Sequence, residues 1–291
     1  MAEKFTLPSC LKGETLPLYL WQPPGEPTGL VQFVHGMAEH MERYEEPAAY
    51  LAAQGYVVVG HTHLGHGPMT RTPGFFGKKG GWDNLLHDIH QVRLWAQQRY
   101  PQLPYYILGH SMGSFLVRCY LMANAQGVKG AILSGTGYYP LALTLAGKMM
   151  SGFFILIGQG MKPNAFINQF VGGKGLGWLS RDEQVQAAYA ADPLCGFPFT
   201  AYGFRDLFDG LNRLAHPENL KNLPRELPVY LFSGDQDPVG QMGAGVKKVA
   251  EEYAAAGLEN VIYTLYPQGR HEMFNELNRQ EVYEKLAAWL G

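Results

Sequence analysis

One short stretch, Gly109-His110-Ser111-Met112-Gly113, constrains the fold of this chain more than any other feature. Residues 105–108 before it form an apolar run typical of a buried strand, and residues 115–122 after it are typical of an amphipathic helix. A strand that turns so abruptly into a helix leaves no room for a Cβ at the two flanking glycines. The stretch therefore predicts a tight strand–turn–helix unit that presents the Ser111 hydroxyl as a candidate nucleophile.

Strands and helices alternate along most of the 291 residues, and 46% of the residues are hydrophobic, enough for a sizeable core. This alternation predicts an α/β fold with a mostly parallel sheet of about eight strands and helices on both faces, where chemistry collects at the carboxyl ends of the strands. We expect a hairpin at 4–22, strands at 30–34, 56–59, 105–108, 128–133, 229–233 and 261–266, and helices at 44–54, 84–100, 115–122, 241–256 and 276–290.

The alternation stops between residues 138 and 220, where glycine, methionine and aromatic residues dominate. We interpret this segment as a helical cap inserted into the core, which then comprises residues 1–137 and 221–291. Apolar side chains of such a cap would form the wall of a substrate pocket. The candidate substrate-binding residues in the cap are Phe153, Phe154, Phe170 and Phe204.

A serine hydroxyl is a weak nucleophile and needs a base that a third group orients. Two histidines, His216 and His271, follow Ser111 in the chain. His216 lies in the expected cap, whereas His271 lies in the loop after the last expected strand. The order serine, acid, histidine along the chain therefore indicates His271 as the catalytic base.

The acid is Asp235 or Asp237, because both lie in the loop after the expected strand 229–233. The ring of Pro238 restricts Asp237 to an extended backbone, which projects its side chain away from the turn and favours Asp237. An oxyanion needs two fixed N–H donors. We assign these to the backbone of Met112, directly after the nucleophile, and of Met37, in the loop after strand 30–34.

The stretch His35-Gly36-Met37-Ala38-Glu39-His40-Met41-Glu42-Arg43-Tyr44 resembles the His-Gly-x-x-Glu-His-x-x-Arg-Tyr pattern of the monoacylglycerol lipase and lysophospholipase group of α/β-hydrolases, a group of the serine aminopeptidase S33 type. The resemblance covers nearly the whole chain, although the cap matches only in part. Further matching positions are His63-Leu64-Gly65-His66-Gly67, Gly109 to Gly113, Ser180-Arg181-Asp182, Asp192-Pro193-Leu194, Gly234-x-x-Asp237 and Gly269-x-His271-Glu272.

The resemblance implies an α/β-hydrolase fold and hydrolysis of carboxylic esters through an acyl-enzyme, with Ser111, Asp237 and His271 as triad and no cofactor or metal. The acid of the family lies three residues after the strand-end glycine, which is Asp237 here. The implied substrate is a small-molecule ester or lipid with an apolar acyl chain. Thr62 stands where the family usually has aspartate, and Pro68 where it has serine. These departures affect the local loop and the part of the pocket that it shapes.

Two alternatives belong to other functional classes. The first is a metal-dependent hydrolase built on His61, His63 and His66, although Gly65 stands where a ligating aspartate would be expected. The second is a binding protein on the same fold that has no catalytic activity. Retention of all three triad residue types favours the serine hydrolase over both.

Charge and cysteine content limit the partners and the compartment. The net charge of −2, without a basic stripe, excludes nucleic acid as an expected partner. Three widely spaced cysteines and an N-terminus without an apolar run indicate the cytoplasm. The longest apolar stretch, 149–161, is shorter than a membrane span of ~20 residues, so we expect at most transient contact with a lipid surface. The oligomeric state stays open.

Overall fold

A computed structural model describes residues 1–171 and 175–291. Its eight-stranded sheet has the order β1-β2-β4-β3-β5-β6-β7-β8, in which β1–β2 and β2–β4 pair antiparallel and the other neighbours pair parallel. The sheet confirms the predicted fold class, including the hairpin at one edge. The strands are β1 (Glu3–Pro8), β2 (Thr15–Trp21), β3 (Gly29–Val34), β4 (Tyr56–His61), β5 (Tyr105–His110), β6 (Val128–Ser134), β7 (Val229–Gly234) and β8 (Val261–Tyr266).

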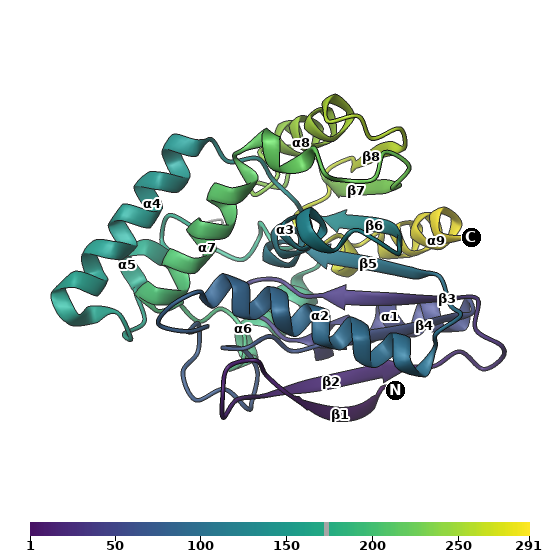
Figure 1. Cartoon of the computed structure of the whole chain (residues 1–291), viewed down its shortest axis with the longest axis horizontal. Coiled ribbons are helices and arrows are strands. Elements are labelled where there is room, and N and C mark those ends of the chain that lie inside the picture. The colour runs from purple at the N-terminus through teal and green to yellow at the C-terminus, as the bar shows by residue number, and fades with distance from the viewer. Residues whose placement is uncertain (172–174) are drawn as a thin grey trace.

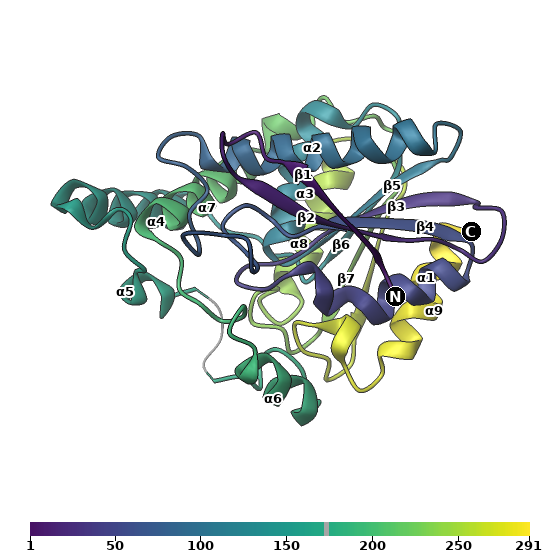
Figure 2. The same ribbon diagram turned by 90° about the horizontal axis from the view of Figure 1, so that it is seen from below.

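Helices cover both faces of the sheet (Figures 1 and 2). Every residue of β3, β4, β5 and β7 is buried, as expected for parallel strands covered on both sides. One face packs against α1 (Glu45–Ala53) and α9 (Arg279–Leu290), and the other against α2 (Gly81–Arg99), α3 (Met112–Asn124) and α8 (Ala244–Ala255). The carboxyl ends of β3 to β8 consequently lie along one edge of the molecule, where the loops carrying the candidate residues meet.

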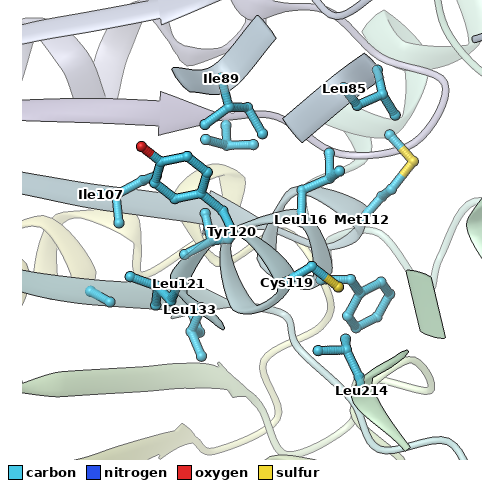
Figure 3. Close-up of a cluster of buried hydrophobic side chains, with 14 of the residues drawn as sticks. Leu85, Ile89, Ile107, Met112, Leu116, Cys119, Tyr120, Leu121, Leu133 and Leu214 are labelled. Carbon is cyan, nitrogen blue, oxygen red and sulfur yellow. The ribbon is translucent and has the colours of Figure 1, made fainter. Parts of the chain in front are cut away.

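The core beside the nucleophile is formed by α3, which packs between α2 and the sheet. Figure 3 shows Met112 and Leu116 of α3 directed toward Leu85 and Ile89 of α2. All four side chains are buried, so the start of α3 is fixed from its apolar side. Rigid packing at this point holds the residues that follow Ser111 in place.

The chain between β6 and β7 forms a separate helical insertion, which projects from one end of the sheet in Figure 1. The predicted cap limits, 138 and 220, fall inside this connection and remain a prediction. Gly147 of α4 (Leu141–Phe154) lies so near Phe208 of α7 (Ala201–Leu214) that a Cβ there would be 2.4 Å from the ring, so this glycine permits the close packing of the two helices. The helices of the insertion are α4 (Leu141–Phe154), α5 (Ala165–Asn168), α6 (Glu183–Ala191) and α7 (Ala201–Leu214).

The apolar stretch that we expected to be too short for a membrane span belongs to a longer helix. α4 continues into a π-helical segment, Ile155–Gln159, and the combined helix Leu141–Gln159 has a mean hydropathy of 1.7 with 17% of its residues buried. By length and composition alone this helix could cross a bilayer, so the expectation about its length was wrong. Its backbone departs from helical geometry at Ile157 and Gly158, and α4 packs along α7. The helix is therefore a largely exposed apolar feature of the insertion.

Candidate active site

The Ser111 backbone adopts a strained conformation at the junction of β5 and α3, with φ 54° and ψ −122°. The predicted steric reason for the glycines is present in the structure. A Cβ on Gly109 would lie 2.3 Å from the Gly113 carbonyl oxygen, and one on Gly113 would lie 2.0 Å from the Val34 carbonyl oxygen. The amide of Ser111 donates to the Ser134 carbonyl oxygen at 2.9 Å, which ties the turn to the neighbouring strand β6.

Two backbone amides lie beside this serine without an internal partner. In the described part of the chain, the N–H groups of Met37 and Met112 make no hydrogen bond to another protein group. Met112 is the first residue of α3, where the helix dipole favours negative charge. Met37 follows β3, and a Cβ on the adjacent Gly36 would lie 3.1 Å from the Ser111 Cβ. The structure therefore brings together both amides that the sequence assigned to an oxyanion.

His271 and Asp237 form a buried pair at the ends of the last two strands. His271 Nδ1 lies 3.0 Å from Asp237 Oδ2, whereas Asp235 accepts the amide of Gln268 at 2.8 Å. The structure thus places Asp237 beside the imidazole and Asp235 away from it. Asp237 also accepts hydrogen bonds from Ser233 Oγ at 2.6 Å and from the amide of the residue after Pro238 at 2.8 Å.

The pKa values of this pair shift in the directions expected for a charge-stabilised imidazole. Burial would raise the pKa of Asp237, but the positive charge and hydrogen bond of His271 lower it below its ordinary value. Burial would lower the pKa of His271, but the charge and hydrogen bond of Asp237 raise it above 6.5. The carboxylate therefore orients the ring and favours its protonated form.

Ser111 and His271 line the same cavity, although no hydrogen bond joins Ser111 Oγ to the ring in the described residues. Two neighbours of His271 were not identified from the sequence. The Trp178 ring lies 5.1 Å from the imidazole, and its carbonyl oxygen accepts the His271 amide at 3.1 Å. The His110 ring lies 4.7 Å away, and burial lowers the pKa of His110 to about 3, so this neighbour is neutral. Trp178 had no sequence motif that could have indicated it.

A buried ionic network connects the loop of Met37 with the loop of His271. The Arg43 guanidinium donates two hydrogen bonds to Glu272, at 2.8 and 2.6 Å, and one to Glu39 at 2.6 Å. Glu39 in turn accepts the Gly36 amide at 2.5 Å and the Tyr44 hydroxyl at 2.7 Å. Burial raises the pKa of Glu39, whereas the bidentate contact with Arg43 lowers that of Glu272 against the effect of burial. Glu39, Arg43 and Glu272 therefore hold the loop that carries Met37 against the loop that carries His271.

The cavity above Ser111 has a volume of about 780 Å³, within the usual range for small-molecule sites. Of the four cap phenylalanines that the sequence indicated, Phe170 lines this cavity. Phe204 is fully buried and packs against the Phe199 ring, while Phe153 is exposed to solvent and contacts Phe154 edge to face. These three do not line the cavity. The prediction was wrong for them because the sequence could not show which face of each helix turns inward. The side chains that form its apolar wall include Met150, Val171, Leu176, Trp178, Leu207, Phe208 and Leu211.

Of the six ring nitrogens in the alternative metal site, five contact other protein groups and one, His61 Nδ1, has no partner among the described residues. His63 Nδ1 lies 3.1 Å from His61 Nε2, and His63 Nε2 lies 3.2 Å from the His35 carbonyl oxygen. His66 contacts the Leu64 carbonyl oxygen through Nδ1 at 3.1 Å and accepts the Ala38 amide through Nε2 at 3.2 Å. The cluster therefore does not offer one ion three free ring nitrogens. This arrangement argues against a catalytic metal at His61, His63 and His66.

A model of the family described as serine aminopeptidase, S33, matches residues 25–278. The chain belongs to this family. A monoacylglycerol lipase of Mycolicibacterium smegmatis is 28% identical to it over 280 residues, covering 93% of this chain and 91% of the relative. The monoglyceride lipase of Rattus norvegicus is 35% identical over 232 residues, covering 77% and 70%. The structure of a thermostable carboxyl esterase from Bacillus coagulans in complex with glycerol matches with a TM-score of 0.91 at 29% identity, covering 99% of this chain and 97% of the esterase.

Proposed function

We propose that this protein is a carboxylic ester hydrolase that acts on monoacylglycerols and related esters with an apolar acyl chain. The observation that carries the proposal is the convergence of Ser111, His271 and two unpaired amides on one apolar cavity. Support also comes from the family and from relatives named monoacylglycerol lipase and carboxyl esterase. The alternatives, a binding protein without activity and a metal-dependent hydrolase, lack a comparable geometric argument.

In the proposed mechanism, Ser111 Oγ attacks the ester carbonyl carbon while His271 Nε2 takes the hydroxyl proton. Asp237 holds the ring through Nδ1 and stabilises the imidazolium that forms. The amides of Met37 and Met112 donate to the oxyanion, which carries the charge that develops in the transition state. His271 then protonates the leaving alcohol, and a water activated by the same ring releases the fatty acid from Ser111. In this mechanism the hydrogen bond between Ser111 Oγ and His271 Nε2 forms in the complex with substrate.

An activity series tests this proposal directly. Purified protein is assayed on glycerol and p-nitrophenyl esters of increasing acyl length and labelled with a fluorophosphonate probe. Ser111→Ala should abolish labelling and lower kcat by roughly 10⁴-fold or more, as expected when a triad nucleophile is removed. Asp237→Asn should lower kcat by roughly 10⁴-fold because the ring loses its orientation, whereas the matched variant Asp235→Asn should stay near wild type. A wild-type protein that is not labelled would favour the binding protein, and loss of hydrolysis upon chelation, restored by zinc, would favour the metal-dependent enzyme.

The insertion supports transient docking of the enzyme to a lipid surface, where its substrates partition. Large apolar side chains are exposed along one side of α4 and α5, which Figure 2 shows at the outer end of the molecule. Burial of such side chains at the headgroup boundary is favourable without insertion of a helix. Neutral phosphatidylcholine vesicles should bind wild type more strongly than a variant with serine at the most exposed positions, which are Leu143, Met149, Phe153, Leu156, Phe166 and Phe170.

All three cysteines lie in the described part of the chain and are free. Free thiols persist in reducing compartments, so we retain the cytoplasm as the proposed location. Fractionation of the producing cells tests this location.

A further inference from the structure

Three side chains with metal-binding atoms meet where the insertion contacts the core. His40, near the start of the chain, lies with Nε2 2.8 Å from Asp192 Oδ2. The amide of Cys195 donates to the Asp192 carbonyl oxygen at 3.0 Å, and this turn brings the thiol back over the carboxylate. One ligand atom from each of the three residues lies within 4.8 Å of the other two. Because His40 and Asp192 are 152 residues apart, the sequence alone could not show this cluster.

The donor set matches the preferences of zinc rather than those of magnesium or calcium, which favour oxygen ligands alone. Tetrahedral Zn²⁺ with bonds of roughly 2.0 Å to nitrogen and oxygen and 2.3 Å to sulfur places its ligand atoms roughly 3.3–3.8 Å apart. The His40–Asp192 separation of 2.8 Å is shorter than this range and the other separations are within 4.8 Å, so the side chains must adjust when an ion binds. The spacing Asp-x-x-Cys is the short spacing that ligand pairs use in zinc sites. The Asp192 side chain is 29% exposed, which gives an ion and a fourth ligand from water access to the cluster.

The charges around the thiol also favour a cation. Of the carboxylates near the thiol, those of Glu39 and Glu272 are paired with the Arg43 guanidinium, so Asp192 is the carboxylate that can serve an ion beside Cys195.

We propose that His40, Asp192 and Cys195 form a binding site for Zn²⁺, with water as the fourth ligand. The ion would tie the insertion to the loop that carries Met37. That loop already contacts the same part of the insertion, because the Ala38 carbonyl oxygen accepts the amide of Gly196 at 2.9 Å and the Tyr189 hydroxyl at 3.3 Å. None of the three ligands is a residue of the proposed triad, and the proposed mechanism of ester hydrolysis does not use the ion.

Cobalt titration tests the site without reference to activity. Full-length protein is reduced, freed of metal with a chelator and titrated with Co²⁺, whose thiolate complexes show a charge-transfer band in the near ultraviolet. Wild type should develop this band with one equivalent of Co²⁺, and one equivalent of Zn²⁺ should remove it. Zn²⁺ should also raise the Tm of wild type, since an ion that binds only the folded state stabilises it.

Cys195→Ser should abolish the band and the rise in Tm, because serine keeps the size of the side chain but is a poor zinc ligand. Cys10→Ser is the matched control, since Cys10 is exposed and lies outside the cluster, and this variant should behave like wild type. A wild-type protein without the band, or a Cys195→Ser variant that retains it, would overturn the proposal. Ester hydrolysis of the metal-free protein is measured in parallel, so failure of the zinc site and failure of the proposed function are distinguished.

Discussion

The hydrogen bond from the Ala38 amide to His66 offers a sharp test of how the oxyanion loop is held. Ala38 has a φ of 52°, an unfavourable conformation for a residue with a side chain. Its amide donates to His66 Nε2 at 3.2 Å, while the contact of Nδ1 with the Leu64 carbonyl oxygen leaves Nε2 as the acceptor. The ring also stacks on Phe76 at 5.8 Å with an interplanar angle of 7°. Replacement of His66 by phenylalanine preserves stacking but removes the acceptor.

The magnitude follows from the burial of the amide that loses its partner. Ala38 is 5% exposed and His66 is 2% exposed, so water cannot replace the ring nitrogen without a local rearrangement. An unsatisfied buried N–H costs about 1–3 kcal/mol. If the loop escapes this cost by moving, the conformation that presents the Met37 amide loses the same free energy, which corresponds to a fall in kcat of roughly 5–150-fold. KM should change little, because the cavity wall is untouched.

Steady-state kinetics on a short-chain p-nitrophenyl ester and urea denaturation measure the two effects on His66→Phe. His61→Phe is the matched control, because His61 belongs to the same buried cluster but does not contact the oxyanion loop. We expect the control to lose stability through overpacking and to retain kcat within about threefold, as for a change that spares transition-state contacts. His66→Gln, which offers a side-chain oxygen as acceptor, should recover part of the lost kcat. If His66→Phe keeps wild-type kcat while losing stability, His66 does not position the loop.

Three further predictions concern the turn, the base and the buried histidines. Gly113→Ala should lower kcat by roughly 10²–10³-fold, as for loss of an oxyanion donor, because its Cβ would lie 2.0 Å from a backbone oxygen of β3. Gly152→Ala, with open space at its Cβ, should leave kinetics unchanged. The acid limb of kcat/KM should lie above pH 6.5, because catalysis needs neutral His271 and the pKa of His271 is raised. Glu272→Gln should move this limb to lower pH, since the Glu272 carboxylate contributes to the rise. A limb that does not move would contradict the assignment of His271 as the base. Burial lowers the pKa of His61 to about 3, so the unfolded chain binds a proton below pH 6.5 that the folded protein does not. His61 should therefore contribute a fall in stability of roughly 1 kcal/mol per pH unit between pH 6.5 and pH 3, and the slope measured by urea denaturation should be shallower by that amount in His61→Phe.

The sequence by itself determined the frame of this protein. Hydrophobic periodicity located the strands and helices of the sheet, because each element buries a face whose spacing is set by its own geometry. The glycines beside Ser111 predicted the turn for a steric reason that acts within a few residues. Chain order and the loop after the last strand indicated His271, since parallel strands place all their carboxyl ends at one edge.

Only the tertiary structure decided which side chains face one another across long separations. It placed Asp237 rather than Asp235 against His271, joined Arg43 to Glu272 across 229 residues, and put Trp178 beside the imidazole. It also showed that Phe170, of the four cap phenylalanines considered, lines the cavity.

The helices of the insertion pack through side chains whose directions depend on the whole assembly, and apolar composition alone cannot distinguish a residue buried between helices from one that lines a pocket or faces solvent. Local sequence fixes what each segment can form, whereas the chemistry at the edge of the sheet arises from contacts that exist only after the segments have packed.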